Sequence, residues 1–215
     1  MKGIGILRST LKITLFFFLS LPVAAQDFDK GVIAFEAGDY VTALKEWRPF
    51  ADQGVSSGQY NLAIMYDNGW GIGQDHTEAI RWYKLAAEQG HTHAQYNLAL
   101  MYEDRIGVAT DYAEARKWHR LAAEQGHGAS QNNLAVGYEY GEGVIQNYVM
   151  AYMWYKLAAS NGSKGSSKWQ NKVALLMTPE EIFIAQTMAR ECIISNYMSC
   201  GWALSHTDGS IKDGT

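Results

Sequence analysis

Three short patterns in the sequence contain residue types that enzymes use for nucleophilic or metal-assisted chemistry. Gly54-Val55-Ser56-Ser57-Gly58 matches the G-x-S-x-G turn of serine hydrolases, and Ser9-Thr10-Leu11-Lys12 matches the S-x-x-K motif of penicillin-recognising enzymes. His91-Thr92-His93 places two imidazoles close together, as in some metal sites. Each pattern predicts a reaction only if the surrounding elements position it correctly.

The surroundings of all three patterns favour a structural interpretation. A nucleophile elbow needs a strand before its serine, whereas Ser56 follows a segment with helical periodicity. No S-D-N or K-T-G partner accompanies the S-x-x-K match, and no Walker, dinucleotide-binding or H-E-x-x-H motif occurs. His91 has an equivalent in His127, 36 residues later, which favours a repeated structural role. We therefore predict no catalytic residue, no cofactor and no metal ligand, and a protein that is not an enzyme.

The first 25 residues have the pattern of a cleaved secretory signal peptide. Lys2, Arg8 and Lys12 precede a short apolar run at 13–21, and Val23-Ala24-Ala25 offers the small residues that a signal peptidase recognises. The run is too short to span a bilayer comfortably, although a retained anchor is the alternative. We expect export to the periplasm, with secretion as the alternative, and no membrane span after cleavage.

The charge of the mature chain excludes one class of partner. Removing residues 1–25 leaves 15 Lys and Arg against 22 Asp and Glu, a net charge of −7. An acidic chain without a basic patch is repelled by phosphate backbones, so we expect no nucleic-acid partner.

A repeat of 36 residues dominates the remaining sequence. Gln59-Tyr60-Asn61-Leu62 recurs at 95–98 and, with one change, at 131–134. The following residues keep the same step: Tyr66, Tyr102 and Tyr138; Gly71, Gly107 and Gly143; Trp82, Trp118 and Trp154; Ala86, Ala122 and Ala158; Gly90, Gly126 and Gly162.

Each repeat has the periodicity of two helices joined by a glycine-rich turn. In the first repeat the helices are expected at about 59–67 and 76–89, with the turn at 69–73. Asp75 and Glu78 have the spacing of a capping box, and Gly90 suits a left-handed position that ends the second helix. The predicted organisation is a signal peptide at 1–25, a degenerate N-terminal repeat or cap at 26–54, repeats at 55–90, 91–126 and 127–162, C-terminal capping helices at 163–204 and a disordered tail at 205–215.

These motifs resemble the Sel-1-like repeat, a relative of the tetratricopeptide repeat. The resemblance rests on A-x-x-Q-Y-N-L-A-x-M-Y, then G-x-G, then A-x-x-W-Y-K-L-A-A-E-Q-G-H, and it covers 58–162. It implies an all-α fold, a right-handed α-solenoid of antiparallel helix hairpins with N- and C-terminal capping helices. Stacking buries the apolar stripe that a single hairpin would expose.

Three of the departures from the repeat pattern bear on local shape and packing. Arg105 occupies the position of Gly69 and Gly141, so we expect its turn to be strained or differently shaped. His119 replaces the tyrosine that follows Trp82, and Gly137 replaces Met65 and Met101. The smaller Gly137 predicts a thinner contact in the third repeat.

The C-terminal segment is similar to the ends of many exported bacterial repeat proteins of this family. Thr178-Pro179-Glu180-Glu181 has the features of a helix start. We expect a Cys192–Cys200 disulfide, with a free redox or metal-binding pair as the alternative. Eight residues of continuous helix would hold the two Cα atoms roughly 12 Å apart. The chain must therefore turn between them, near Ser195-Asn196.

By the same resemblance, the first helix of each repeat lines a concave face that binds partners. We predict contacts at Ile64, Asp67, Asn68, Leu100, Glu103, Asp104, Val136, Glu139 and Tyr140. These positions would form a mixed apolar and acidic groove for a peptide or helix with apolar anchors and basic residues, although ordinary solvated positions are the alternative.

The predicted function is a non-catalytic scaffold or adaptor that binds an unidentified protein of the bacterial cell envelope, and we expect a monomer. One alternative is a repeat protein that binds or hydrolyses peptidoglycan or β-lactams. Another is a secreted effector that engages host proteins.

Overall fold

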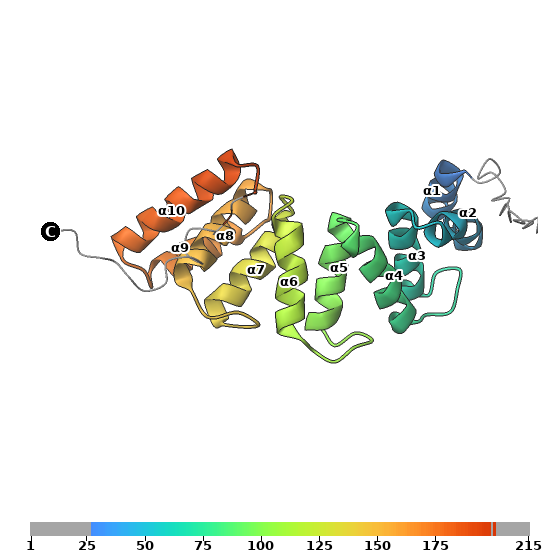
Figure 1. Ribbon diagram of the computed structural model, residues 1–215, viewed down its shortest axis with the longest axis horizontal. Coiled ribbons are helices and arrows are strands. Elements are labelled where there is room, and N and C mark those ends of the chain that lie inside the picture. The colour runs from blue at the N-terminus through green and yellow to red at the C-terminus, as the bar shows by residue number, and fades with distance from the viewer. Residues whose placement is uncertain (1–26, 199, 201–215) are drawn as a thin grey trace, which may run out of the picture.

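The computed structural model describes residues 27–198 and 200 as an elongated, all-α solenoid (Figure 1). Its helices are α1 (Phe28–Glu36), α2 (Tyr40–Asp52), α3 (Ser56–Asn68), α4 (His76–Glu88), α5 (Thr92–Glu103), α6 (Tyr112–Ala123), α7 (Gly128–Tyr140), α8 (Tyr148–Ser160), α9 (Ser166–Ala174) and α10 (Pro179–Ile194). Helices α1 to α8 form four successive hairpins, and each helix packs on its neighbours in the chain. Among the described residues, no helix is both long and apolar enough to cross a membrane.

Two predicted segments, the signal peptide at 1–25 and the tail at 205–215, lie outside the described residues. The S-x-x-K match at 9–12 lies outside them as well. The degenerate N-terminal unit is described almost completely. It is a complete helix hairpin, α1–α2, whose turn consists only of residues 37–39.

Aspartate side chains cap the second helices as the sequence predicts. Asp75 accepts hydrogen bonds from the Thr77 and Glu78 amides at the start of α4, and Asp111 does the same for the Glu114 amide in α6. The reciprocal half of the predicted capping box does not form there. Glu78 instead pairs with Arg81 one turn further along, at 2.9 Å. A complete capping box occurs at Thr178 and Glu181 in α10.

Buried glutamines connect the two helices of each repeat and also fasten them to the preceding hairpin. The Nε2 atom of Gln95 donates to the carbonyl of Ala87, and that of Gln131 donates to the carbonyl of Ala123, both at 3.0 Å. The Oε1 atom of Gln95 accepts from Gln125 at 2.8 Å. The side chains of Gln95 and Gln131 are almost fully buried, so their satisfied hydrogen bonds offset the cost of removing them from water.

Glycines with positive φ shape the turns between and within repeats. Gly90, Gly126 and Gly162 have φ between 80° and 86°, as their predicted left-handed positions require. Gly71, Gly107 and Gly143 have φ near 70°, and their Cα atoms lie against the first residue of the second helix one hairpin earlier. Each turn within a repeat is thereby packed on the previous hairpin.

Arg105 adopts the same left-handed region as the glycines it replaces, with φ of 59°. Helix α5 ends at Glu103, one residue earlier in the repeat than α3 and α7. The turn is therefore altered in shape, and its arginine carries the cost of a Cβ atom at positive φ.

We expect Arg105→Gly to raise the free energy of unfolding by about 1 kcal/mol, because glycine adopts this φ without that steric cost. Thermal and urea unfolding would measure the gain. Arg105→Ala is the matched control, since it removes the long side chain but keeps the Cβ atom. Equal stabilisation by both variants would assign the effect to the side chain and not to the backbone.

The chain closes with α9 and α10, which both pack on α8. Helix α10 ends at Ile194, and Asn196 and Tyr197 have φ of 52° and 66°, so the chain reverses where the sequence predicts a turn. This reversal brings the Cα atoms of Cys192 and Cys200 to 4.5 Å, and the two residues form a disulfide.

Candidate partner-binding groove

The first helices of successive repeats present partly buried apolar side chains to a row of surface hollows. Ile64, Leu100 and Val136 occupy the same repeat position on α3, α5 and α7. The central hollow, of about 320 Å³, lies between α3 and α5. Its lining residues are Ile64, Asp67, Asn68, Tyr83, Asn97, Leu100, Met101, Asp104 and Ile106.

Two further hollows adjoin the central hollow, one on each side. The N-terminal hollow, about 270 Å³, is mostly apolar and is lined by Val32, Phe35, Glu36, Trp47, Asn61 and Ile64. The acidic hollow, about 210 Å³, is lined by Glu103, Asp104, Tyr112, Arg116, Asn133, Val136 and Glu142. Ile64 borders both the N-terminal and the central hollow, and Asp104 borders both the central and the acidic hollow. The three hollows therefore adjoin one another in a row along α1, α3, α5 and α7, and we call this row the groove.

Seven of the nine predicted contact residues line this groove, and two do not. Glu139 is only 5% exposed, whereas Tyr140 is 55% exposed at the end of α7 but is not among the lining residues of the three hollows. Asn68 and Asp104 are exposed, so they remain available to a ligand.

Each first helix carries an acidic residue at the same repeat position: Asp67, Glu103 or Glu139. In each repeat a side chain of the second helix contacts this carboxylate. Tyr155 donates its hydroxyl hydrogen bond to Glu139 at 2.7 Å, and Tyr83 contacts Asp67 at 3.5 Å. Burial, reinforced by these carboxylates, raises the pKa of both tyrosines, so the phenols stay protonated donors. Reversing the charge at these acids would therefore disturb packing within the repeat as well as the groove.

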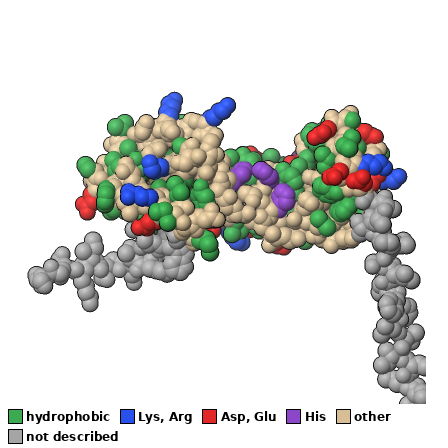
Figure 2. All heavy atoms as spheres, turned by 90° about the horizontal axis from the view of Figure 1, so that it is seen from above, with side chains coloured by type: hydrophobic (Ala, Val, Ile, Leu, Met, Phe, Trp, Pro, Cys, Tyr) green, Lys and Arg blue, Asp and Glu red, His purple; other side chains and the backbone are tan. Residues whose placement is uncertain are grey.

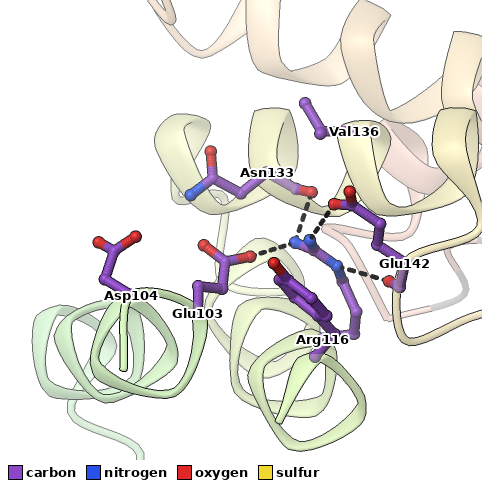
Figure 3. Close-up of a pocket in the computed structure, with 7 residues that line it drawn as sticks. Glu103, Asp104, Arg116, Asn133, Val136 and Glu142 are labelled. Carbon is purple, nitrogen blue, oxygen red and sulfur yellow. Dashed lines mark hydrogen bonds and ion pairs between the residues drawn. The ribbon is translucent and has the colours of Figure 1, made fainter. Parts of the chain in front are cut away.

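In the middle repeat this position holds a polar network that sequence patterns alone did not predict (Figure 3). The guanidinium of Arg116 is 3% exposed and pairs with Glu103 at 2.5 Å and with Glu142 at 3.6 Å. It also donates to the carbonyls of Asn133, at 2.8 Å, and Glu142, at 3.0 Å. The carboxylates of Glu103 and Glu142 lie on either side of the guanidinium.

His119 contacts the same network from α6. Its Nε2 atom lies 3.4 Å from Glu103. Burial works against ionisation of Glu103, but hydrogen bonds and charges from His119 and Arg116 outweigh burial and lower the pKa of the carboxyl. Burial also lowers the pKa of His119, which favours the neutral ring. With Glu103, Asp104 and Glu142 opposing one buried cation, the acidic hollow favours a positively charged ligand group.

The long side chain of Arg116 occupies the space that Gly137, which has no side chain, leaves open. An added Cβ at Gly137 would overlap the Arg116 side chain, so the glycine makes room for the guanidinium. The same pair of positions, 21 residues apart, holds Leu44 and Met65, or Ile80 and Met101, at the preceding interfaces. The contact predicted to be thin is therefore filled by arginine.

The histidines near the starts of α5 and α7 act as helix caps. The Nδ1 atoms of His91 and His127 accept hydrogen bonds from the amides of Ala94 and Ser130, each at 3.2 Å. A neutral ring that accepts through Nδ1 carries its hydrogen on Nε2, so binding a metal through Nε2 would disrupt the cap. Within the described residues, no cluster of three or more potential ligands is placed to hold a metal ion.

These caps make the stability of the fold sensitive to acid. Burial, and next the charge of His93, lowers the pKa of His91 and His127 below the usual 6.5. Below that pH the unfolded chain binds more protons than the folded one, so stability falls as pH decreases from 6.5 through the folded pKa.

We expect the melting temperature to fall as the pH decreases from about 7 to about 5. Each lost cap should lower the free energy of unfolding by about 1 kcal/mol. The double variant His91→Asn, His127→Asn keeps a capping acceptor that does not titrate, and its pH dependence should be flatter. His119 leaves a residual slope of the same sign. Calorimetry across this pH range is the measurement, and identical slopes in both proteins would contradict the cap assignment.

The G-x-S-x-G segment does not form a nucleophile elbow. Ser56 is the first residue of α3, and the turn before it follows helix α2 instead of a strand. This geometry matches the predicted turn between repeats.

Comparisons with known proteins agree with the observed repeats. The family model for the Sel1 repeat matches residues 56–91, 92–127 and 128–163. A crystal structure of a Sel1 repeat protein from Oxalobacter formigenes is similar at a TM-score of 0.66 and 30% identity, over 73% of this chain and 63% of that one.

A second solved structure is c5321, a protective antigen of uropathogenic Escherichia coli with an SLR fold. It is 27% identical at a TM-score of 0.57, over 90% of this chain and 50% of that one. The chain thus spans less than two thirds of the length of either protein. No curated protein matches the chain.

Sel1 repeats generally serve as protein–protein interaction modules, and the groove described above is consistent with that role. The three matched repeats cover half of the chain and coincide with the hairpins α3–α4, α5–α6 and α7–α8. The chain belongs to the Sel1 repeat family.

Proposed function

We propose that this protein is a non-catalytic adaptor of the bacterial cell envelope that binds a segment of a partner protein in the groove. The observation that carries the proposal is the row of three adjoining hollows, which share Ile64 and Asp104 as lining residues. Grooves along stacked hairpins suit extended or helical segments that contact several repeats at once.

The chemistry of the groove changes along its length and so specifies the ligand. Val32, Phe35 and Trp47 make the N-terminal hollow apolar, whereas Asp104 and Glu142 make the far hollow acidic. A segment with a large apolar residue at one end and lysine or arginine at the other would match both ends. This arrangement would also fix the direction in which the segment binds.

The predicted export to the periplasm supports an envelope partner. The signal-peptide pattern at 1–25 predicts secretion, and a Cys192–Cys200 disulfide is typical of proteins that fold in an oxidising compartment. We do not carry the peptidoglycan or β-lactam alternative further, because no observation on the described residues favours it, and its S-x-x-K match at 9–12 lies outside them.

Selection from a random peptide library would test the proposal. We expect enriched peptides to combine an apolar residue with lysine or arginine, and to bind Asp104→Arg at least about tenfold more weakly. Asp104 is exposed, so this variant should fold normally. Lys84→Glu, on an exposed site of α4, is the control for a charge change outside the groove. Enrichment that is unaffected by Asp104→Arg would contradict the assignment.

A further inference from the structure

One segment of the described chain differs sharply in charge from the residues before it. Residues 27–142 contain 17 acidic and 9 basic residues, a net charge of −8, whereas residues 143–179 contain four lysines and no acidic residue. Three of these lysines, Lys164, Lys168 and Lys172, lie in or just before α9. The protein is acidic overall, but the start of its C-terminal cap is basic, so the expectation of a chain without a basic patch is wrong for this segment.

The exposed side of α9 combines lysines with large apolar side chains. Trp169 is 38% exposed, and Leu175 and Leu176, at the turn after the helix, are 85% and 58% exposed. The ammonium groups of Lys168 and Lys172 lie 5.8 and 4.9 Å from the centre of a Trp169 ring. We call these five residues the cap patch.

The opposite side of α9 explains why the cap patch faces outward. Ser166 and Val173 are fully buried, and α9 packs on α8 through this side. The last unit of a solenoid normally presents a polar outer surface to water. The two leucines of the cap patch break that rule. Figure 2 shows basic and apolar side chains intermingled over this end of the molecule.

We propose that the cap patch docks the protein onto the surface of an anionic phospholipid bilayer. Tryptophan prefers the headgroup region, leucines at a turn can enter the acyl boundary, and lysines extend towards lipid phosphates. This mode needs no spanning helix. It would leave the groove, which lies on α1 to α7, free to bind its partner.

Charge favours the bilayer over a second copy of the chain. A two-fold contact through the cap patch would oppose Lys168 and Lys172 to the same two lysines, and like charges repel. Glu180 and Glu181 follow the patch at the start of α10 and reduce the local positive charge. The carboxylate of Glu181 is held by the Thr178 amide at 2.7 Å.

Vesicle flotation would test this proposal on the chain that begins at Gln26, which contains every described helix. Vesicles of phosphatidylglycerol and phosphatidylcholine would be compared with vesicles of phosphatidylcholine alone. We expect binding to the anionic vesicles, weakened by salt, and roughly tenfold weaker binding for the double variant Lys168→Gln, Lys172→Gln. Leu175→Ser with Leu176→Ser should also weaken binding.

Matched controls separate the cap patch from general surface effects. Lys84→Gln with Lys117→Gln removes two exposed lysines elsewhere, and Ile145→Ser removes an apolar side chain that is 90% exposed. Both should bind as the parent chain does. The proposal is overturned if the parent fails to bind anionic vesicles, or if the controls weaken binding equally. It is also overturned if sedimentation shows a dimer that the leucine substitutions dissociate, since the patch would then bind a second copy.

Discussion

Replacing Arg116 with isoleucine should lower the free energy of unfolding by about 3–5 kcal/mol, although isoleucine occupies the equivalent position in the preceding repeat. The substitution removes the main cation beside the mostly buried Glu103 and leaves a void above Gly137. Gly137→Met alone should also destabilise, because its side chain would collide with the guanidinium. Chemical denaturation monitored by circular dichroism would measure both losses.

The double variant Arg116→Ile, Gly137→Met provides the sharper test. It recreates the Ile80 and Met101 pair of the neighbouring interface, so it fills the void and removes the collision, and its loss should be clearly smaller than the sum of the two single losses. The remaining deficit would be the cost of Glu103 without its arginine. Losses that simply add in the double variant would contradict the interlocking of these two residues.

Gly143→Ala should destabilise the fold by about 3 kcal/mol, more than its exposed position in a turn would suggest. The residue has φ of 72°, and an added Cβ would overlap the backbone carbonyl of Tyr112 in the previous repeat. Alanine would therefore add backbone strain and separate two stacked hairpins.

Gly90→Ala is the matched control for this prediction. Gly90 has a similar φ of 86°, but an added Cβ there would meet no atom within 4 Å. Its cost should be limited to strain of about 1–2 kcal/mol. Differential scanning calorimetry of the two variants would compare them. Equal losses would mean that Gly143 is needed only for its positive φ and not for close packing against the previous hairpin.

The repeat period made most of the fold predictable from the sequence. Residues such as Gly90 and Asp75 act locally, through the φ of one turn and the amides of one helix start, so their roles followed directly from residue type. The turn near Ser195-Asn196 followed from a length constraint, since a helix cannot bring Cys192 and Cys200 together. The capping role predicted for the Glu78 side chain was wrong, because Arg81, one turn away, pairs with its carboxylate.

The candidate site was less predictable because it depends on contacts between repeats. Ile64 and Leu100 were predicted as groove contacts from their places on the first helices. The burial of Glu139 was not, because it depends on Tyr155 of the facing helix. The role of Arg116 was not predicted, because a single arginine on a helix is normally a solvent-exposed charge. The signal that could have identified it was the joint departure of Arg116 and Gly137 from an otherwise apolar pair of positions.

Site-specific photo-crosslinking in the source cell tests the central claim most directly. A crosslinking residue would replace Ile64 or Leu100 in the groove, with Lys84 and Lys117 on exposed sites of the second helices as controls. Mass spectrometry would then identify what is captured. We predict one envelope protein that is trapped from both groove positions and from neither control. Equal capture from groove and control positions, or capture of cell-wall material alone, would contradict the adaptor proposal.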